Sequence, residues 1–486
     1  MPSKVALIGL DCATPELVFD RFLPDLPNLR RLVSSGVHGP LESTIPPITV
    51  PAWMCMMTGR DPGTLGIYGF RNRKDHSYNG LTIASSRMVR EDAVWDALAR
   101  RGLRSIMVGI PLTYPPRPVN GLMVSGFPMP GPDAEYTYPP GLRAEIRERF
   151  GEYIADVRQF RTDDKARLLD DIHAMTRQRF ALARHLVTTH PWDFLAMVEM
   201  GPDRMHHGFW RYWDRDHPLH EPGNPLESAL HDYYVALDAE IGRTLEVLPP
   251  DTLVLVVSDH GAKRMDGGVC LNEWLLREGY LALREPVSKL TPFSPDLVDW
   301  ERTRAWGDGG YYGRVFLNVA GREPRGMVPA KGYEALRDEL TRRLEALPGP
   351  DGQAIGTRVF RPEHVYRAVT NVAPDLIAYF GDLHWRSVGS LGHASVWTPD
   401  NDTGPDDANH AQQGIAVLWE GGGAGGGTRR EGMSIYDVAP TILRAFGIEP
   451  PPGMGRNALA SEAGPAGYTD EEEAEIARRL EDLGYL

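Results

Sequence analysis

Six short runs of apolar residues recur along the chain, and they are apolar throughout rather than alternating with polar residues. They are residues 5–10, 105–110, 194–200, 252–258, 376–380 and 415–420. Runs of this length are typical of parallel strands buried on both faces of a sheet. The pattern therefore predicts a sheet that is covered on both sides.

Helical periodicity separates several of these runs. Residues 163–189 and 226–247 both carry apolar residues three to four positions apart, and the first of these segments ends at His190-Pro191. Strands that alternate with helices predict an α/β fold, here a doubly wound, mainly parallel sheet flanked by helices.

The alternation breaks between residues 286 and 404, a stretch rich in Pro, Gly, Trp and Arg with one clear helical pattern near 331–347. This stretch is predicted to be an inserted cap, although the run 376–380 is also compatible with a return to the main sheet. The cap's aromatic and basic residues are candidates for ligand contacts or for ordinary core and surface positions. They are Trp306, Tyr311, Tyr312, Arg314, Arg322, Arg325 and Trp385.

The predicted organisation has three parts. The catalytic α/β domain is expected at residues 1–285 and 405–463, the cap at 286–404, and a charged amphipathic helix at 464–486 that docks on its own domain.

Composition limits the kinds of molecule that the chain is expected to bind and indicates its cellular location. The chain has 486 residues, 42% of them hydrophobic, and a net charge of −14. A chain this acidic is expected to bind nucleic-acid polymers and anionic membranes poorly. Three cysteines without a CxxC pair, a short apolar run at the N-terminus and no apolar stretch of about 20 residues favour a cytoplasmic protein.

Carboxylates and imidazoles stand at the ends of the predicted strands, where ligands bind in open α/β sheets. Aspartate and histidine together are typical ligands of Zn²⁺ and related ions. Three strands are followed, and a fourth is preceded, by such residues: Asp11, Asp203 with His207, Asp259 with His260, and His410.

Each of these residues alone also has an ordinary explanation, because aspartates often cap turns and helices and a single histidine is usually a surface or core residue. The pairs are more informative. Asp203 and His207 share one face of a helical turn, and Asp259 and His260 leave a strand together. The combination of four such places makes the ordinary explanation improbable.

Thr49 lies among the prolines of the segment TIPPITVPAW, residues 44–53. Prolines fix the backbone around it, and a hydroxyl at a helix start would meet N–H groups suited to an anion. Bound to a metal, such a hydroxyl becomes a nucleophile. A simple threonine helix cap is the alternative.

Six ordered motifs together resemble the alkaline phosphatase superfamily, and within it the type I phosphodiesterase/nucleotide pyrophosphatase branch. They are Asp11, IPPITVPAW with TGRDPGTLGIYG, GPDRMHHGFW, VVSDHG, NHAQQG and SIYDVAPTIL. The resemblance covers about residues 1–285 and 405–460.

The resemblance implies two divalent ions about 4 Å apart, with Zn²⁺ expected and Mn²⁺ or Fe as alternatives. One ion would be held by Asp203, His207 and His410. The other would be held by Asp11, Asp259, His260 and the Thr49 oxygen. Thr49 would attack phosphorus, and water would release the resulting phospho-threonine. The implied substrate is a small phosphate ester, a diester rather than a monoester.

Two other histidines are alternatives to the assigned ligands, and two positions differ from the family pattern. His393 competes with His410, which fits the family's HxxxG pattern better, and His206 competes with His207, which alone is spaced i, i+4 from Asp203. Ala52 stands where many nucleotide pyrophosphatases have asparagine, and Phe70 stands near the family's phosphate-binding asparagine. Asn72 is therefore the candidate substrate-binding residue, with a solvated basic turn as the alternative.

Three other functions compete with hydrolysis. A cofactor-independent phosphomutase would pass the phosphoryl group to another hydroxyl, but usually has a serine nucleophile. A sulfatase needs an oxidisable cysteine or serine in a C/S-x-P-x-R context, whereas Thr49 is followed by Val50, Pro51, Ala52 and Trp53. A non-catalytic metal-binding protein would be expected to lack a ligand or the nucleophile.

Overall fold

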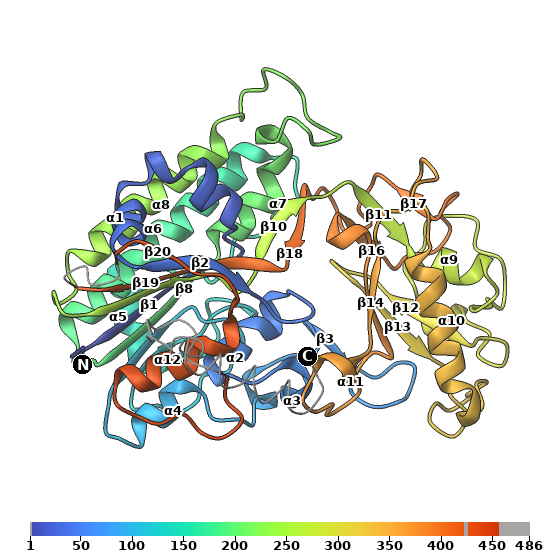
Figure 1. Cartoon of the computed structure of the whole chain (residues 1–486), viewed down its shortest axis with the longest axis horizontal. Coiled ribbons are helices and arrows are strands. Elements are labelled where there is room, and N and C mark those ends of the chain that lie inside the picture. The colour runs from blue at the N-terminus through green and yellow to red at the C-terminus, as the bar shows by residue number, and fades with distance from the viewer. Residues whose placement is uncertain (1, 422–425, 456–486) are drawn as a thin grey trace, which may run out of the picture.

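A ten-stranded sheet forms the centre of the larger lobe in the computed structural model, which describes residues 2–421 and 426–455 (Figure 1). Nine strands follow one another in the order β20 (Thr428–Arg429), β2 (Val37–Glu42), β19 (Gln413–Glu420), β9 (Leu253–Val257), β1 (Val5–Leu10), β8 (Phe194–Glu199), β5 (Ser105–Val108), β6 (Gly121–Val124) and β7 (Thr137–Tyr138), and β21 (Met433–Ser434) pairs with β2.

The middle of this sheet is parallel, as the apolar runs predict. β1 pairs in parallel with β8 on one side and β9 on the other, and β5 pairs in parallel with β8 and β6. Every residue of β1 is buried, because helices cover both of its faces. The doubly wound, mainly parallel α/β fold is confirmed.

One predicted strand runs the other way. β19, which contains the run 415–420, is antiparallel to both β9 and β2. An apolar run indicates burial on both faces but carries no information about direction, so the expectation that this strand is parallel is wrong.

Helices pack on both faces of the sheet (Figure 1). One face carries α1 (Pro27–Ser35), α6 (Lys165–Thr189), α7 (Gly201–Trp213) and α8 (Ala229–Leu245). The other face carries α2 (Thr49–Thr58), α4 (Val94–Ala99) and α12 (Val438–Ala445), with α3 (Pro62–Leu65) beyond them and α5 (Leu142–Phe150) at the β7 edge. The helices expected at 163–189 and 226–247 correspond to α6 and α8.

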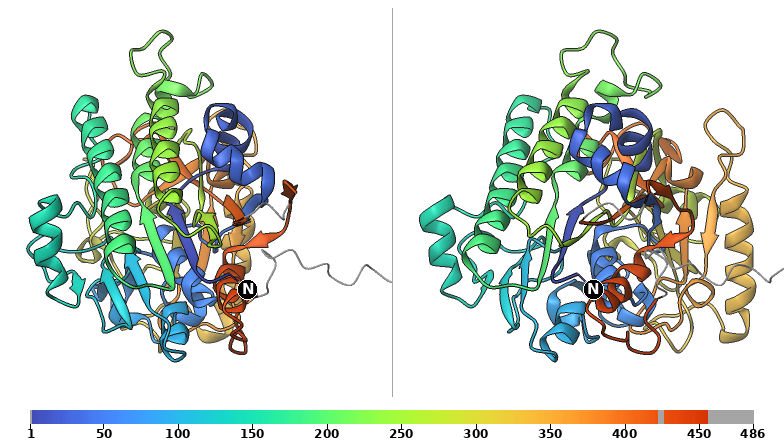
Figure 2. Two further views of the ribbon diagram at one scale, coloured as in Figure 1. Left: turned by 90° about the vertical axis from the view of Figure 1, so that its left-hand side faces the viewer. Right: turned by 60° about the vertical axis from the view of Figure 1, so that its left-hand side comes forward.

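The smaller lobe has its own sheets and core (Figures 1 and 2). Four antiparallel strands follow the order β12 (Ala305–Asp308), β13 (Gly313–Leu317), β15 (Leu376–Tyr379) and β14 (Arg358–Phe360), packed against α10 (Tyr333–Glu345). A second sheet joins β16 (Trp385–Val388), β11 (Gly267–Cys270) and β17 (Trp397–Thr398), beside α9 (Leu271–Arg277), and α11 (Pro362–Val365) lies after β14.

The run 376–380 therefore belongs to the inserted region and does not return to the main sheet. The core of the smaller lobe begins at Val269 and includes Leu271 and Trp274. Packing thus favours a boundary near residue 267, while the division at residue 286 stays a prediction. The helix expected at 464–486 lies outside the described residues.

Two short ladders connect the lobes. β10 (Gly261–Arg264) pairs with β18 (Ala408–Ala411), and β3 (Arg71–Arg73) forms a hairpin with β4 (Leu81–Ile83) that approaches the smaller lobe. Among the residues that the structure describes, no helix combines the length and the apolar character needed to cross a bilayer.

Candidate metal centre

The parallel strands β1, β8 and β9 end at one edge of the sheet, and each is followed at once by predicted site residues. Asp11 follows β1, Asp203 lies in the first turn of α7 after β8, and Asp259 with His260 follows β9. Because the three strands are adjacent, their carboxyl ends bring these side chains together. His410 reaches the same place from β18.

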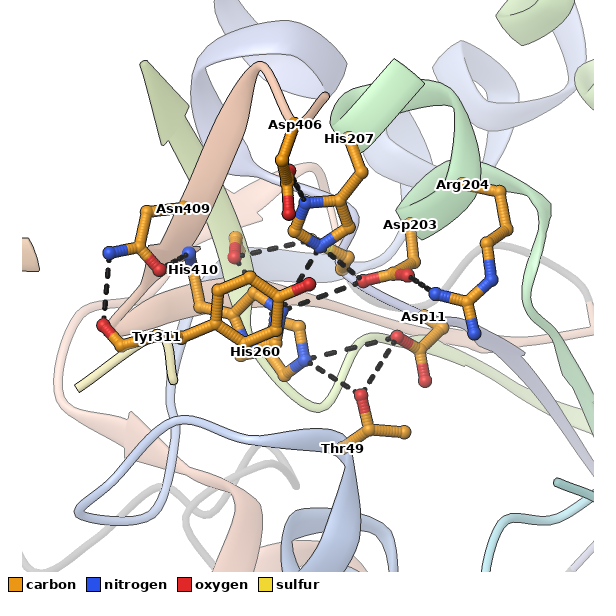
Figure 3. Close-up of polar contacts among 12 residues, drawn as sticks. Asp11, Thr49, Asp203, Arg204, His207, His260, Tyr311, Asp406, Asn409 and His410 are labelled. Atoms are coloured by element: carbon orange, nitrogen blue, oxygen red, sulfur yellow. Dashed lines mark hydrogen bonds and ion pairs between the residues drawn. The ribbon is translucent and has the colours of Figure 1, made fainter. Parts of the chain in front are cut away.

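The first group consists of Asp203, His207 and His410, all buried (Figure 3). His207 Nε2 lies 3.3 Å from Asp203 Oδ1 and 3.3 Å from His410 Nε2, and His410 Nε2 lies 3.7 Å from Asp203 Oδ1. His410 is oriented by the Pro47 carbonyl, 2.8 Å from its Nδ1. Three ligand atoms therefore face one point.

The second group consists of Asp11, Asp259 and His260, also buried. His260 Nε2 lies 3.3 Å from Asp259 Oδ2 and 3.8 Å from Asp11 Oδ1. The Thr49 hydroxyl joins this group, since its oxygen is 3.2 Å from His260 Nε2 and 3.5 Å from Asp11 Oδ1 (Figure 3). The seven residues predicted from the sequence are thus brought together, in the two sets that the motifs implied.

The two rival histidines lie elsewhere. His206 points to the other side of α7, where its Nε2 is 3.0 Å from the Tyr234 hydroxyl and its ring packs edge-on against Trp210. His393 Nε2 is 2.9 Å from the Ser390 hydroxyl in the inserted region. Neither histidine is part of the two ligand groups.

Thr49 is the first residue of α2, and Trp53, one turn later in the same helix, fixes the neighbouring carboxylate. The Trp53 indole N–H donates to Asp11 Oδ2 at 2.6 Å. Its ring lies against Gly9, where an added Cβ would be only 2.4 Å from the indole. Gly9 in β1 therefore makes room for the side chain that orients Asp11.

Asn72, in β3, is buried, and its side chain bonds to the backbone just before β3 rather than to a residue of the metal groups. Its Oδ1 accepts from the Tyr68 N–H at 2.7 Å, and its Nδ2 donates to the Gly69 carbonyl at 2.8 Å. The side-chain amide thus stabilises its own loop. Its role in substrate binding stays a prediction.

Two buried carboxylate oxygens at the centre lack a hydrogen-bond partner among the described residues. They are Asp203 Oδ1 and Asp259 Oδ2, and each belongs to one of the two groups. Each has a histidine Nε2 at 3.3 Å, but not in hydrogen-bond geometry. A buried carboxylate oxygen without a hydrogen bond is costly, and a divalent cation would relieve that cost. The donor set of carboxylates and imidazoles fits Zn²⁺, Mn²⁺ or Fe.

Electrostatics at the second group support the same interpretation. Burial, reinforced by the nearby Asp259 and Asp203 carboxylates, raises the pKa of Asp11 well above its ordinary value. Burial likewise raises the pKa of Asp259 and lowers the pKa of His260 to about 4. Without bound metal the buried site therefore disfavours the ionised forms of Asp11 and Asp259, and bound cations would reverse that preference.

His207 differs, because a buried aspartate holds it from behind. Asp406 Oδ1 is 2.6 Å from His207 Nδ1, and Asp406 Oδ2 accepts from Arg161 Nε at 2.9 Å. Burial disfavours the charged imidazole, but Asp406 and Asp203 outweigh burial and raise the pKa of His207 to about 9. Asp406 thus fixes the ring with Nε2 toward Asp203.

Arg204 and Tyr311 complete the surroundings (Figure 3). Arg204 Nη1 donates to Asp203 Oδ2 at 2.5 Å, while its Nε and Nη2 bind Asp156 at 2.8 and 2.6 Å. The Tyr311 ring stacks on His410 at 4.1 Å and on His207 at 4.9 Å. Tyr311 comes from the inserted region, so this region contributes one wall of the site.

Sequence reasoning missed Asp406, Arg204 and the specific place of Tyr311. Asp406 shortly precedes the predicted His410, and a search for carboxylates that could support the metal-binding histidines would have found it. Arg204 follows Asp203 directly, but its sequence position alone does not distinguish it from a surface arginine.

The family comparison agrees with this geometry. Residues 5–409 match the model of the family described as type I phosphodiesterase / nucleotide pyrophosphatase. A comparison with curated proteins found no match.

Solved structures share the fold at low sequence identity. Human ectonucleotide pyrophosphatase/phosphodiesterase 5 is 14% identical, with a TM-score of 0.55 over 94% of this chain and 100% of that chain. The murine protein in an inactive form bound to AMP gives 14% and 0.53 over 94% and 100%. Phosphonoacetate hydrolase from Sinorhizobium meliloti 1021, in complex with phosphonoformate, gives 14% and 0.56 over 91% and 96%.

Proposed function

Because the chain belongs to the type I phosphodiesterase/nucleotide pyrophosphatase family, we propose that it hydrolyses a small phosphate ester, a diester in preference to a monoester, through a phospho-threonine intermediate on Thr49. Phosphodiesterases and nucleotide pyrophosphatases are hydrolytic enzymes that cleave bonds to phosphorus.

One observation carries the proposal. The Thr49 hydroxyl is 3.2 Å from His260 Nε2 and 3.5 Å from Asp11 Oδ1, at the edge of a buried cluster of six carboxylate and imidazole groups. A hydroxyl oriented in this way beside a divalent metal site is an activated nucleophile.

Asp203, His207 and His410 would hold one ion, and Asp11, Asp259, His260 and Thr49 the other. Two bound divalent ions, with Zn²⁺ preferred, would neutralise charge on the transferring group and lower the pKa of the Thr49 hydroxyl.

The chain's own residues position the reaction. Thr49 Oγ gives up its proton and forms a bond to phosphorus while the bond from phosphorus to the leaving oxygen breaks, and the leaving oxygen takes up a proton. Water then attacks the same phosphorus and the bond between phosphorus and Thr49 Oγ breaks. The water oxygen stays on the product, and a proton from the water returns to the Thr49 oxygen. The first turn of α2 keeps Thr49 in place, and Tyr311 covers the histidines on one side.

The preference for a diester rests on the inserted region. Tyr311 brings that region against the metal centre, so a second substituent on phosphorus would find protein there rather than bulk water. The murine relative bound to AMP and the hydrolase bound to phosphonoformate are consistent with a small phosphorus-containing ligand in this fold.

A panel of substrates tests the proposal. Protein reconstituted separately with Zn²⁺, Mn²⁺ and Fe²⁺ is assayed with aryl phosphodiesters, phosphomonoesters, phosphonates and sulfates. We expect the diester to turn over fastest, and T49A to lower kcat by at least about 1000-fold, as loss of a nucleophile does.

T58A is the matched control, because Thr58 is a buried threonine of the same helix whose hydroxyl donates to the Met54 carbonyl and accepts from the Arg60 N–H, and contacts none of the metal-site residues. It should keep the wild-type kcat. Undiminished diester turnover by T49A would contradict the proposal, and phosphoryl transfer to a second hydroxyl without release to water would favour the phosphomutase alternative.

A further inference from the structure

We propose that a cavity in the inserted region binds the organic substituent on the substrate's phosphorus, and that Arg386 is a specificity-determining residue that binds an oxyanion on this substituent. The oxyanion is a carboxylate or a further phosphate group. This inference rests on the proposed function and specifies its substrate class.

The cavity measures about 560 Å³ and lies between the β3–β4 hairpin and the sheets of the smaller lobe. Its lining includes Arg71, Tyr78, Phe293, Trp306 and Arg386. The volume is that of a site for a small organic molecule. None of the seven predicted metal-site residues contributes to this lining as the structure describes it, so the cavity is distinct from the metal centre.

Arg386, in β16, is buried with 4% of its surface exposed. Its Nε and Nη1 have no hydrogen-bond partner within the described ranges. Its nearest carboxylate oxygen, Asp406 Oδ2, is 3.6 Å from Nη1 and already accepts from Arg161 Nε at 2.9 Å. Two buried guanidinium nitrogens without hydrogen bonds are costly, and an oxyanion in the cavity would supply the missing acceptors.

Arg386 stands on the wall that separates the cavity from the metal centre. Ser387, the next residue, exchanges two backbone hydrogen bonds with Gly310, at 2.8 and 2.9 Å. Tyr311 follows Gly310, its ring stacks on His410 at 4.1 Å, and the Arg386 guanidinium lies 5.7 Å from that ring. A substituent that leaves the phosphorus along Tyr311 would therefore reach Arg386.

The other charges of the cavity are largely engaged. Asp308 pairs with Arg314, Arg73 pairs with Glu323 at 3.3 Å, and Asp402 accepts from the Ser390 hydroxyl at 3.0 Å. Arg71 is exposed at the rim. Arg386 is therefore the buried cation in the lining whose hydrogen-bonding capacity is least used.

Part of the rim of the cavity is apolar. Leu81 and Leu290 both line it and remain 52% and 60% exposed. Exposed leucines at a cavity mouth favour a ligand with an apolar body. The combination predicts a substituent with an aryl or similar apolar body and a negative group at its far end.

Two phosphodiesters with the same leaving group test this inference. 4-Nitrophenyl phenyl phosphate and 4-nitrophenyl 4-carboxyphenyl phosphate both release 4-nitrophenol and differ in one carboxylate; a 4-phosphonophenyl ester gives a second oxyanion. We expect wild-type kcat/KM to favour the charged esters. In R386M the ratio of charged to uncharged kcat/KM should fall about 10- to 100-fold, mainly through KM, as for a lost hydrogen bond to a charged group.

R386K should retain part of the preference, because it keeps the charge without the planar fork. R302M is the matched control: Arg302 belongs to the same region, has a side chain 75% exposed and does not line the cavity. It should keep the wild-type ratio.

An unchanged ratio in R386M, with all esters slowed equally, would overturn the inference, because Arg386 would then only position Asp406 behind His207. A wild-type enzyme that does not prefer either charged ester would overturn it as well. The two charged arms decide between a carboxylate and a phosphate-like group.

Calorimetry separates failure of this inference from failure of the proposed function. The T49A variant, in the presence of Zn²⁺, is titrated with benzylphosphonate and with 4-carboxybenzylphosphonate. Tighter binding of the carboxylated ligand, lost in T49A/R386M, would support the role of Arg386 even if no diester turned over. Equal binding of both ligands would refute that role.

Discussion

The buried charged side chains around the metal centre neutralise one another only in part when no cation is bound. Asp203 and Asp259 each leave a buried oxygen without a hydrogen bond in the part of the chain that the structure describes. Arg204, His207 and Asp406 form a connected set of ion pairs around the first group. Asp406 belongs to neither ligand group but is 2.6 Å from His207 Nδ1, so its effect on metal binding would pass through His207.

Replacing Asp406 with asparagine keeps the shape of the side chain and removes its charge. We expect the metal affinity of the first group to fall about 10- to 100-fold, as for other carboxylates behind a ligating histidine. Metal bound per chain, measured by elemental analysis at buffered free Zn²⁺, checks this. D400N replaces an exposed aspartate of the same segment and should bind like wild type; unaltered affinity in D406N would refute the role of Asp406.

The raised pKa of His207 predicts how the stability of the metal-free protein depends on pH. Its pKa is raised to about 9 in the metal-free protein, above the ordinary value near 6.5. The stabilisation from this imidazolium is fully present below pH 6.5 and is lost as pH rises through 9. It amounts to at most about 3.5 kcal/mol, from a difference of about 2.5 between the two pKa values at roughly 1.4 kcal/mol per pKa unit.

Metal-free protein should therefore lose stability between pH 6.5 and 9, in urea unfolding followed by circular dichroism. The same proton must leave before a metal binds Nε2, so Zn²⁺ affinity at the first group should rise with pH over this range. In D406N the pH-dependent loss of stability should shrink. A metal-free protein whose stability is constant or increases over this range would contradict the assignment.

The sequence predicted which side chains come together at the candidate centre better than it predicted their surroundings, for a physical reason. Asp11 and Asp259 directly follow apolar runs, and Asp203 follows one after Gly201 and Pro202. Strand ends converge in an α/β sheet. Asp406 and Tyr311 lie in loops without such a signal, and their contacts with His207 depend on how two distant segments pack. Thr49 was identified from its prolines, whereas the way Gly9 admits Trp53 became evident only from the packing.

At the scale of secondary-structure elements, α7 presents two adjacent histidines to opposite environments. His207 faces Asp203 and His410, whereas His206 is 3.0 Å from the Tyr234 hydroxyl and packs beside Trp210. Burial lowers the pKa of His206 to about 3, so it is a neutral core residue. The i, i+4 spacing on a helix is what separates the two.

Because His206 and His207 are adjacent but face opposite environments, a variant of His206 is the control for a variant of His207. H207A should lose one of the two metal ions and most diester turnover, because it removes a ligand. H206A should keep both ions and lose about 2–4 kcal/mol of unfolding free energy, the usual cost of truncating a buried side chain. Elemental analysis and urea unfolding of both variants check this; full metal content in H207A would contradict the ligand assignment.

Apolar runs located the strands of the central sheet but not their partners. β1 has the predicted bounds, and β5, β8 and β9 differ from the prediction by one or two residues. The runs 376–380 and 415–420 look alike in sequence, yet one forms β15 in the smaller lobe and the other forms antiparallel β19. Burial on both faces is encoded locally, whereas pairing depends on the connections between strands.

At the scale of the whole molecule, the metal centre lies where the two lobes meet. The main sheet and the helices on it supply Thr49 and five of the six candidate ligands, and β18 supplies His410. The smaller lobe supplies Tyr311 and the cavity with Arg386. The chemical step and the choice of substrate are thereby assigned to different parts of the chain. This division explains why the motifs predict the reaction class from sequence and leave the substrate open.

The phospho-threonine can be sought directly. Zn²⁺-reconstituted protein is mixed with excess 4-nitrophenyl phenyl phosphate, quenched in acid within milliseconds, digested and analysed by mass spectrometry. We predict a phenyl phosphoryl adduct on the peptide containing Thr49, formed as fast as the first equivalent of 4-nitrophenol and lacking in T49A. Rapid turnover with no adduct on Thr49, or with an adduct on another residue, would contradict its role as nucleophile.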